Sequence, residues 1–150
     1  MALWTVPVYS QRTLSLCWEA CARMMWHWRH KGLKGYKKRA GSYLNRTGGM
    51  SQDQLNIFYR HLGMKFRKNP TGDHLRQALR VTPAIFSTMS RVSGHAMVAR
   101  GHNKGKYTVI NPCAQQIVSF GGGADSCSAG GVELTETYVD SRLGLYIWYW

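Results

Sequence analysis

The chain has 150 residues, 44% of them hydrophobic, which is enough to bury about two-thirds of its unfolded surface in one core. Lysine and arginine number 20 against 7 acidic residues, for a formal net charge of +13. No apolar run approaches the roughly 20 residues that a membrane span needs, and the first residues lack the pattern of a signal peptide. We therefore expect a single domain over residues 1–150, without a membrane span.

The positive charge would attract acidic proteins, nucleic acid or anionic lipid. Its densest cluster lies within residues 31–39, which we predict to be a surface loop. The other basic residues are spread along the chain and match no nucleic-acid-binding module. We expect no specific binding of nucleic acid, although a basic module that binds nucleic acid or protein stays an alternative function.

Two cysteines and two histidines follow one another at Cys17, Cys21, His27 and His30, so a zinc site has to be considered. Only five residues separate the two pairs, where a zinc finger has about 12, and all four residues would lie on one helix. Cys17 and Cys21 are one helical turn apart, which fits a helix better than a disulfide framework. We expect no metal and no cofactor.

The first predicted helix covers residues 16–30, where no breaker interrupts apolar residues at helical spacing. Ser15 is predicted to cap it, and Glu19 lies in the first turn, where the helix dipole favours an acid. Gly32 lies just past the end of this helix. Cys17 therefore falls in the first turn.

Further elements follow in chain order. Ser51 and Gln54 form a capping box for a second helix that ends at Gly63, and residues 71–80 predict a short third helix. From there the pattern changes to that of strands. The predicted strands are Ala84–Thr88, His95–Gly101, Tyr107–Asn111, Gln116–Phe120 and Leu143–Trp150. The glycine-rich residues 121–131 are predicted to be a linker or a flap near a site.

Cys17 meets one condition for a reactive thiol, because a helix N-terminus lowers a cysteine pKa, especially beside an imidazolium. Taken alone, a cysteine at this position would be expected to be structural, since cysteine is among the most buried residue types. A nearby base is needed to change that interpretation.

The base is predicted from a β-hairpin, in which two strand-like segments flank residues 102–106. If its turn centres on Asn103, Ala99 pairs with Tyr107 and His95 pairs with Asn111. Directly opposed residues have Cβ atoms about 5 Å apart, so the amide could fix the imidazole tautomer. The hairpin thus supplies a candidate base and a residue that orients it.

Gln11 lies six residues before Cys17, near enough for its side-chain amide to share an anion site with the Cys17 backbone N–H. The order of Gln11, the helix start CWEA at 17–20, His95 and Asn111 resembles that of papain-like cysteine peptidases. The resemblance implies an oxyanion-hole glutamine, a nucleophile, a base and an orienting asparagine at Gln11, Cys17, His95 and Asn111.

Two departures from plant and lysosomal enzymes indicate a compact variant. Leu14-Ser15-Leu16 replaces their Cys-Gly-Ser/Ala, and His95 follows Cys17 by 78 residues instead of about 130–150. Residues 93–113 resemble small bacterial domains, such as peptidase domains that process bacteriocin leaders and effector or toxin proteases. That resemblance implies an α+β papain-like fold, with N-terminal helices packed on a C-terminal antiparallel β-sheet.

A nucleophile 17 residues from the first methionine leaves no room for an inhibitory pro-segment, so another factor would have to restrain the protease. We expect the C-terminal toxin domain of a larger polypeptide, secreted or delivered into the cytoplasm of a target cell. Its basic charge favours an acidic immunity protein as the partner, beside a protein substrate.

Other reactions are open to the same residues. A cysteine deamidase, a transglutaminase or acyltransferase and a cell-wall amidase can all use a Cys-His-Asn triad, since only the acceptor or the amide differs. The sequence identifies no substrate-binding residue.

Overall fold

Six antiparallel strands form one sheet in the order β1-β6-β2-β3-β4-β5. The computed structural model describes residues 3–9, 16–89, 94–112 and 132–150. The strands are β1 (Lys65–Lys68), β2 (Ala84–Met89), β3 (Gly94–Asn103), β4 (Lys106–Ile110), β5 (Val132–Thr135) and β6 (Leu143–Tyr149). The helices are α1 (Cys17–His30), α2 (Tyr36–Ala40), the 3-10 helix η1 (Gly41–Asn45), α3 (Gln52–His61), α4 (Gly72–Leu79) and α5 (Glu136–Asp140).

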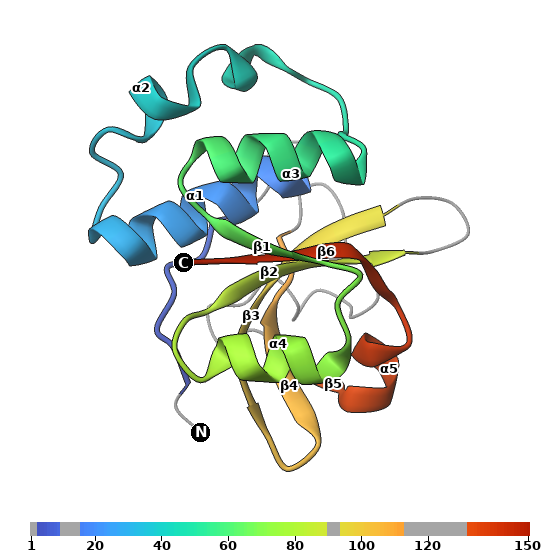
Figure 1. The fold of residues 1–150 in the computed structure, drawn as a ribbon. Coiled ribbons are helices and arrows are strands. Elements are labelled where there is room, and N and C mark those ends of the chain that lie inside the picture. The colour runs from blue at the N-terminus through green and yellow to red at the C-terminus, as the bar shows by residue number, and fades with distance from the viewer. Residues whose placement is uncertain (1–2, 10–15, 90–93, 113–131) are drawn as a thin grey trace.

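Helices cover both faces of this sheet (Figure 1). α1, α2 and α3 lie on one side of it, whereas α4 and α5 lie on the other. Each side has its own hydrophobic core, so that Ile85 of β2 packs towards α1 while Phe86 packs towards α4. The α+β class is confirmed, and helices pack on an antiparallel sheet as predicted.

The three predicted helices are present. α3 has the predicted capping box between Ser51 and Gln54. At α4 a second capping box joins Thr71 and His74, where the imidazole accepts from the Thr71 backbone. Ser15 lies outside the described residues, and Leu16 occupies the N-cap position of α1 without a side-chain hydrogen bond.

Four predicted strands correspond to β2, β3, β4 and β6. The predictions for residues 116–120 and 121–131 fall outside the described part of the chain. β1 and β5 were not predicted, and β1 interrupts the expected order of helices followed by strands. All four residues of β1 are exposed, so the strand lacks the alternation of polar and apolar residues that reveals a half-buried strand.

The basic cluster at residues 31–39 is not the plain loop that we predicted, because the short helix α2 begins within it. Tyr36 is buried at the start of that helix, while Lys37 and Lys38 are exposed. In the described ranges, none of the helices combines the length and the apolarity that crossing a membrane requires.

Candidate active site

Cys17 is the first residue of α1 and is partly buried between this helix and the sheet. The backbone N–H of Ala96, in β3, donates a hydrogen bond of 3.4 Å to Cys17 Sγ. This bond joins residues 79 positions apart in the sequence. It places the sulfur beside the backbone that directly follows His95.

His95 and Asn111 are brought together at one end of the β3–β4 pair. His95 is the second residue of β3, and Asn111 directly follows β4. A short hydrogen bond joins His95 Nε2 to Asn111 Oδ1, and both side chains are buried. With Nε2 engaged in this way, Nδ1 is the ring nitrogen on the other side of the imidazole.

The predicted hairpin register is wrong, although the predicted contact between His95 and Asn111 exists. Ala99 pairs with Val109 and not with Tyr107. The turn is formed by Lys104 and Gly105, whose positive φ angles of 50° and 75° suit a two-residue hairpin turn.

A bulge at Arg100 then shifts the register by one residue back towards the predicted pairing. Continuing the observed pairs would set Met97 opposite Asn111, which makes His95 and Asn111 diagonal neighbours. Long side chains reach across such a diagonal, so the contact survives the change of register.

Burial moves the pKa values of the thiol and the imidazole in opposite directions. It raises the pKa of Cys17, and this effect exceeds the opposing influence of the backbone N–H groups of Ala96, Trp18 and Cys17. Burial lowers the pKa of His95, although the bond to Asn111 opposes it. The lowered cysteine pKa expected from the helix N-terminus is therefore not found, and both groups favour their neutral forms.

Aromatic packing holds the start of α1 in place. Trp18 is 1% exposed, and its ring meets that of Phe58 edge to face with centroids 5.2 Å apart. Its indole N–H donates to Gly48 O at 3.2 Å, and Tyr59 Oη donates to its backbone oxygen at 2.9 Å. Trp18 is thus a core residue that fixes the position of its neighbour Cys17.

Gln11 is the remaining predicted site residue, whereas Cys21, His27 and His30 are the residues considered with Cys17 as zinc ligands and set aside. Gln11 lies outside the described residues. Cys21 is fully buried in the core, where burial raises its pKa well above the ordinary value. His27 instead meets Tyr9 Oη at 2.8 Å, and His30 packs on Trp26. Within the described ranges no three histidine, cysteine or acidic residues gather as a metal site would require.

Two features near Cys17 were missed from the sequence. One is the N–H of Ala96, a backbone donor that no residue type in the sequence would indicate. The other is Glu19, which is 3% exposed and accepts from Arg23 Nε at 2.7 Å and from Tyr36 Oη at 3.0 Å. The spacing of Glu19 and Arg23, four residues apart on a helix, is the one signal that could have indicated this cluster.

A family model described as papain-like cysteine protease AvrRpt2 matches residues 2–121 of the chain. A search of curated proteins found no match.

Solved structures of bacterial peptidase domains share the fold. The peptidase domain of Streptococcus ComA, a bifunctional ABC transporter involved in a quorum-sensing pathway, is 11% identical, with a TM-score of 0.61 over 95% of each chain. A double-glycine-motif protease from an AMS/PCAT transporter, solved with a leader peptide, is 15% identical. Its TM-score is 0.62 over 99% of this chain and 94% of that one. The Streptococcus mutans ComA peptidase domain is 11% identical with a TM-score of 0.58, over 96% and 98% of the two chains.

Proposed function

The chain belongs to the family of papain-like cysteine proteases whose model is named for AvrRpt2. From that premise we propose that Cys17, His95 and Asn111 are its catalytic triad. The protease would cleave peptide bonds of a protein substrate. One observation carries the proposal: Cys17 Sγ accepts from the N–H that follows His95, while His95 Nε2 is held by Asn111. This arrangement supports the proposal, because the sulfur lies beside the residue that follows the imidazole in β3.

The first step would begin from neutral groups, since burial favours the thiol of Cys17 and the neutral imidazole of His95. Cys17 Sγ attacks the carbonyl carbon of the scissile bond while its proton passes to His95 Nδ1. The resulting imidazolium keeps its Nε2–H on Asn111 Oδ1, which maintains the ring orientation.

The second step returns the proton. As the tetrahedral intermediate collapses, His95 donates its Nδ1 proton to the leaving amine, and an acyl group remains on Cys17. Water then attacks the thioester carbonyl and gives a proton to His95, which passes it back to the departing sulfur. The cycle ends with a carboxylic acid, an amine and both groups neutral.

The oxyanion would be held by the Cys17 backbone N–H at the start of α1 and by the side-chain amide of Gln11. Each such donor contributes roughly 2.7–4 kcal/mol to stabilising the transition state. Gln11→Ala should therefore lower kcat by about 100-fold or more, and Gln11→Glu, which offers no such donor, should not restore it.

The triad is tested by mapping new protein N-termini in a cell extract treated with the wild-type chain or with Cys17→Ala. New N-termini in the wild-type sample alone support the proposal. Cys21→Ala is the matched control, because it removes a buried thiol outside the proposed triad, and it should give the wild-type pattern. Equal cleavage by Cys17→Ala would contradict the triad. Deamidated or crosslinked products without new termini would instead identify the other reactions of such a triad.

We further propose that residues 1–150 act as a single toxin domain, the C-terminal part of a larger polypeptide delivered into the cytoplasm of a target cell. The net charge of +13 suits restraint in the producing cell by an acidic immunity protein. Coexpression with the acidic product of a neighbouring gene should restore growth and yield a complex that dissociates at high salt. If such a product neither binds the chain nor restores growth, that result contradicts this role.

A further inference from the structure

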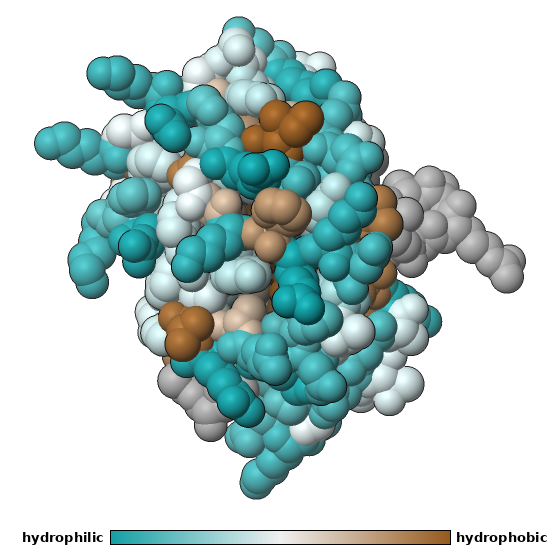
Figure 2. Space-filling model, viewed as in Figure 1, coloured by the Kyte–Doolittle hydropathy of each residue, from teal (hydrophilic) through white to brown (hydrophobic). Residues whose placement is uncertain are grey.

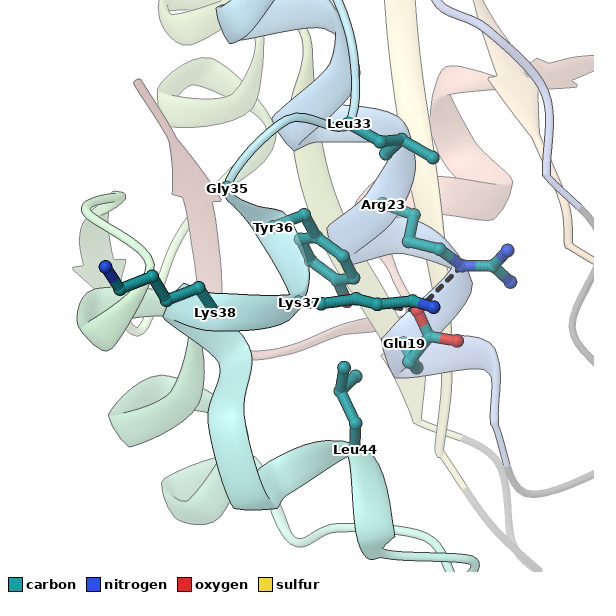
Figure 3. Close-up of a pocket in the computed structure, with 8 residues that line it drawn as sticks. All are labelled: Glu19, Arg23, Leu33, Gly35, Tyr36, Lys37, Lys38 and Leu44. Atoms are coloured by element: carbon teal, nitrogen blue, oxygen red, sulfur yellow. Dashed lines mark hydrogen bonds and ion pairs between the residues drawn. The ribbon is translucent and has the colours of Figure 1, made fainter.

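A pocket of about 670 Å³ lies between the start of α1 and the α2–η1 segment. Figure 3 shows its lining: Glu19 and Arg23 come from α1, Leu33 from the connection to α2, and Leu44 from η1. Gly35, Tyr36, Lys37 and Lys38 complete the lining. The pocket is thus built by three neighbouring segments, and the triad proposal assigns it no role.

The inside of the pocket offers apolar contact without a dominant charge. Leu33 is 38% exposed and Leu44 is partly buried, so both can contact a ligand. The carboxylate of Glu19 is paired with Arg23 and accepts from Tyr36 Oη, which offsets its negative charge. An apolar side chain can enter such a space without leaving a buried ion unpaired.

The rim is basic. Lys37 and Lys38 are exposed at the start of α2, and among the described residues neither forms a salt bridge. Figure 2 shows long hydrophilic side chains projecting from the side of the molecule where α2 lies in Figure 1. Exposed lysines that form no salt bridge attract acidic groups of a partner.

The pocket lies close to the thiol along the chain. Glu19 is two residues beyond Cys17, which corresponds to about 3 Å along the helix axis and nearly opposite sides of the helix. An extended peptide advances about 3.3 Å per residue. The helix is about 10–12 Å across with its side chains, so about four extended residues of a substrate held at Cys17 would span that width.

We propose that this pocket is an exosite for the protein substrate, which binds an acidic segment carrying one large apolar side chain a few residues from the cleaved bond. The apolar side chain fills the space beside Leu33 and Leu44, and the acidic residues lie against Lys37 and Lys38. The inference rests on the proposed protease function, and it adds the class of substrate segment that the enzyme selects.

Binding is measured first, on the Cys17→Ala protein, so that no cleavage interferes. The probes are short fluorescent peptides: glutamate-rich with one leucine, the same peptide with alanine in place of leucine, and a lysine-rich peptide with leucine. The acidic leucine peptide should bind most tightly, at least about fivefold above the other two, and binding should weaken with salt. Equal binding of all three peptides would overturn the exosite.

Two variants locate the binding site. Lys37→Glu with Lys38→Glu should weaken binding of the acidic leucine peptide by about tenfold or more, because two attractive charges become repulsive. Lys65→Glu with Lys68→Glu is the matched control, since it changes the net charge equally at exposed positions of β1 that do not line the pocket. If both double variants weaken binding equally, only the net charge matters and the pocket is not the site.

Cleavage then tests whether the bound segment belongs to the substrate. A cleavable peptide extended by the acidic leucine segment should show a KM about tenfold lower than the unextended peptide, with similar kcat, and Leu33→Ser should remove much of that gain. A segment that only inhibits when added separately would contradict a substrate exosite and indicate an inhibitor site. If Cys17→Ala binds the segment but the wild-type chain cleaves nothing, the triad proposal fails while the binding site stands.

Discussion

Two polar clusters in this molecule are built in opposite ways. The Arg76 network, on the α4 side of the sheet, consists of Arg76, Asp73, Glu136, Asp140 and Tyr107. The thiol site, with Cys17, His95 and Asn111, contains no ion pair in the described residues, while the Arg76 network is made of them.

The pKa directions make the difference chemical. In the Arg76 network burial acts to lower the pKa of Arg76, but hydrogen bonds to Asp140 and Asp73 together with nearby charges raise it overall. The hydrogen bond to Arg76 lowers the pKa of Asp73. Both shifts keep Arg76 and Asp73 charged over the working pH range. At the thiol site burial favours the neutral forms of both Cys17 and His95. Fixed charges suit a structural role, whereas neutral neighbours can exchange a proton during a reaction.

The largest expected effect separates the two clusters by activity. His95→Ala should lower kcat by about 10²–10⁴-fold, because general base and general acid catalysis are both lost. Arg76→Met should leave kcat within about twofold at temperatures where the variant is folded. Steady-state kinetics with one peptide substrate measures both, and full activity of His95→Ala would remove the imidazole from the mechanism.

Stability should show the reverse pattern. Arg76→Met removes the shared partner of Asp140 and Tyr107 and should lower the free energy of unfolding by about 2–3 kcal/mol. This is less than for a fully buried pair, since the Arg76 side chain is 22% exposed and solvent screens it. Arg29→Met, at the exposed end of α1, is the control. Urea unfolding that gives equal values for both variants would contradict a structural role of the network.

Asn111 allows a finer test at the thiol site. Asn111→Ala should lower kcat/KM by about 10–100-fold, because the imidazole loses the bond that orients it. Asn111→Asp should keep more activity and raise the pKa of His95, since a carboxylate stabilises the imidazolium. The acid limb of the pH–rate profile would then move to higher pH. If the acid limb does not move, the protonation of His95 does not determine the position of that limb.

Close packing around the Arg76 network is tested at Gly72. A Cβ at this position would lie 2.1 Å from a carboxylate oxygen of Asp140, so Gly72→Ala must displace the acid that pairs with Arg76. We expect a loss of about 1–3 kcal/mol in the free energy of unfolding. Gly49→Ala meets open space and should change stability by less than about 0.5 kcal/mol. A Gly72→Ala variant as stable as wild type would show that Asp140 can move freely.

The smallest effect is the pH dependence of stability. Below about pH 6.5 an unfolded His95 takes up a proton that the folded one resists, so acidification should reduce the free energy of unfolding. Above about pH 8.5 an unfolded Cys17 loses a proton that the folded thiol keeps, so stability should fall again as the pH rises. Urea unfolding of His95→Asn should show a weaker decline on the acid side. An unchanged acid slope would contradict the lowered pKa of His95.

Local signals in the sequence were enough to predict a helix with Cys17 in its first turn and the contact of His95 with Asn111. The register was not predictable, because the turn is centred between Lys104 and Gly105 and not on Asn103, and a bulge at Arg100 then shifts the pairing back by one residue. The contact tolerated this error since diagonal neighbours on a sheet still touch.

The pKa of Cys17 could not be deduced from local structure. A helix N-terminus is visible in sequence, but the burial that outweighs it depends on how α1 packs against β3. The Arg76 network was missed for the same reason, because Arg76 and Asp140 are 64 residues apart and their pairing depends on where α4 and α5 meet.

The central claim is that Cys17 is the nucleophile, and alkylation followed by peptide mapping tests it most directly. The folded chain is treated with iodoacetamide until activity is lost, and the modified cysteine is located by mass spectrometry. We predict that activity falls in step with modification of Cys17, while the fully buried Cys21 stays unmodified. Full activity of a chain completely alkylated at Cys17, or loss of activity with Cys17 unmodified, would contradict the account.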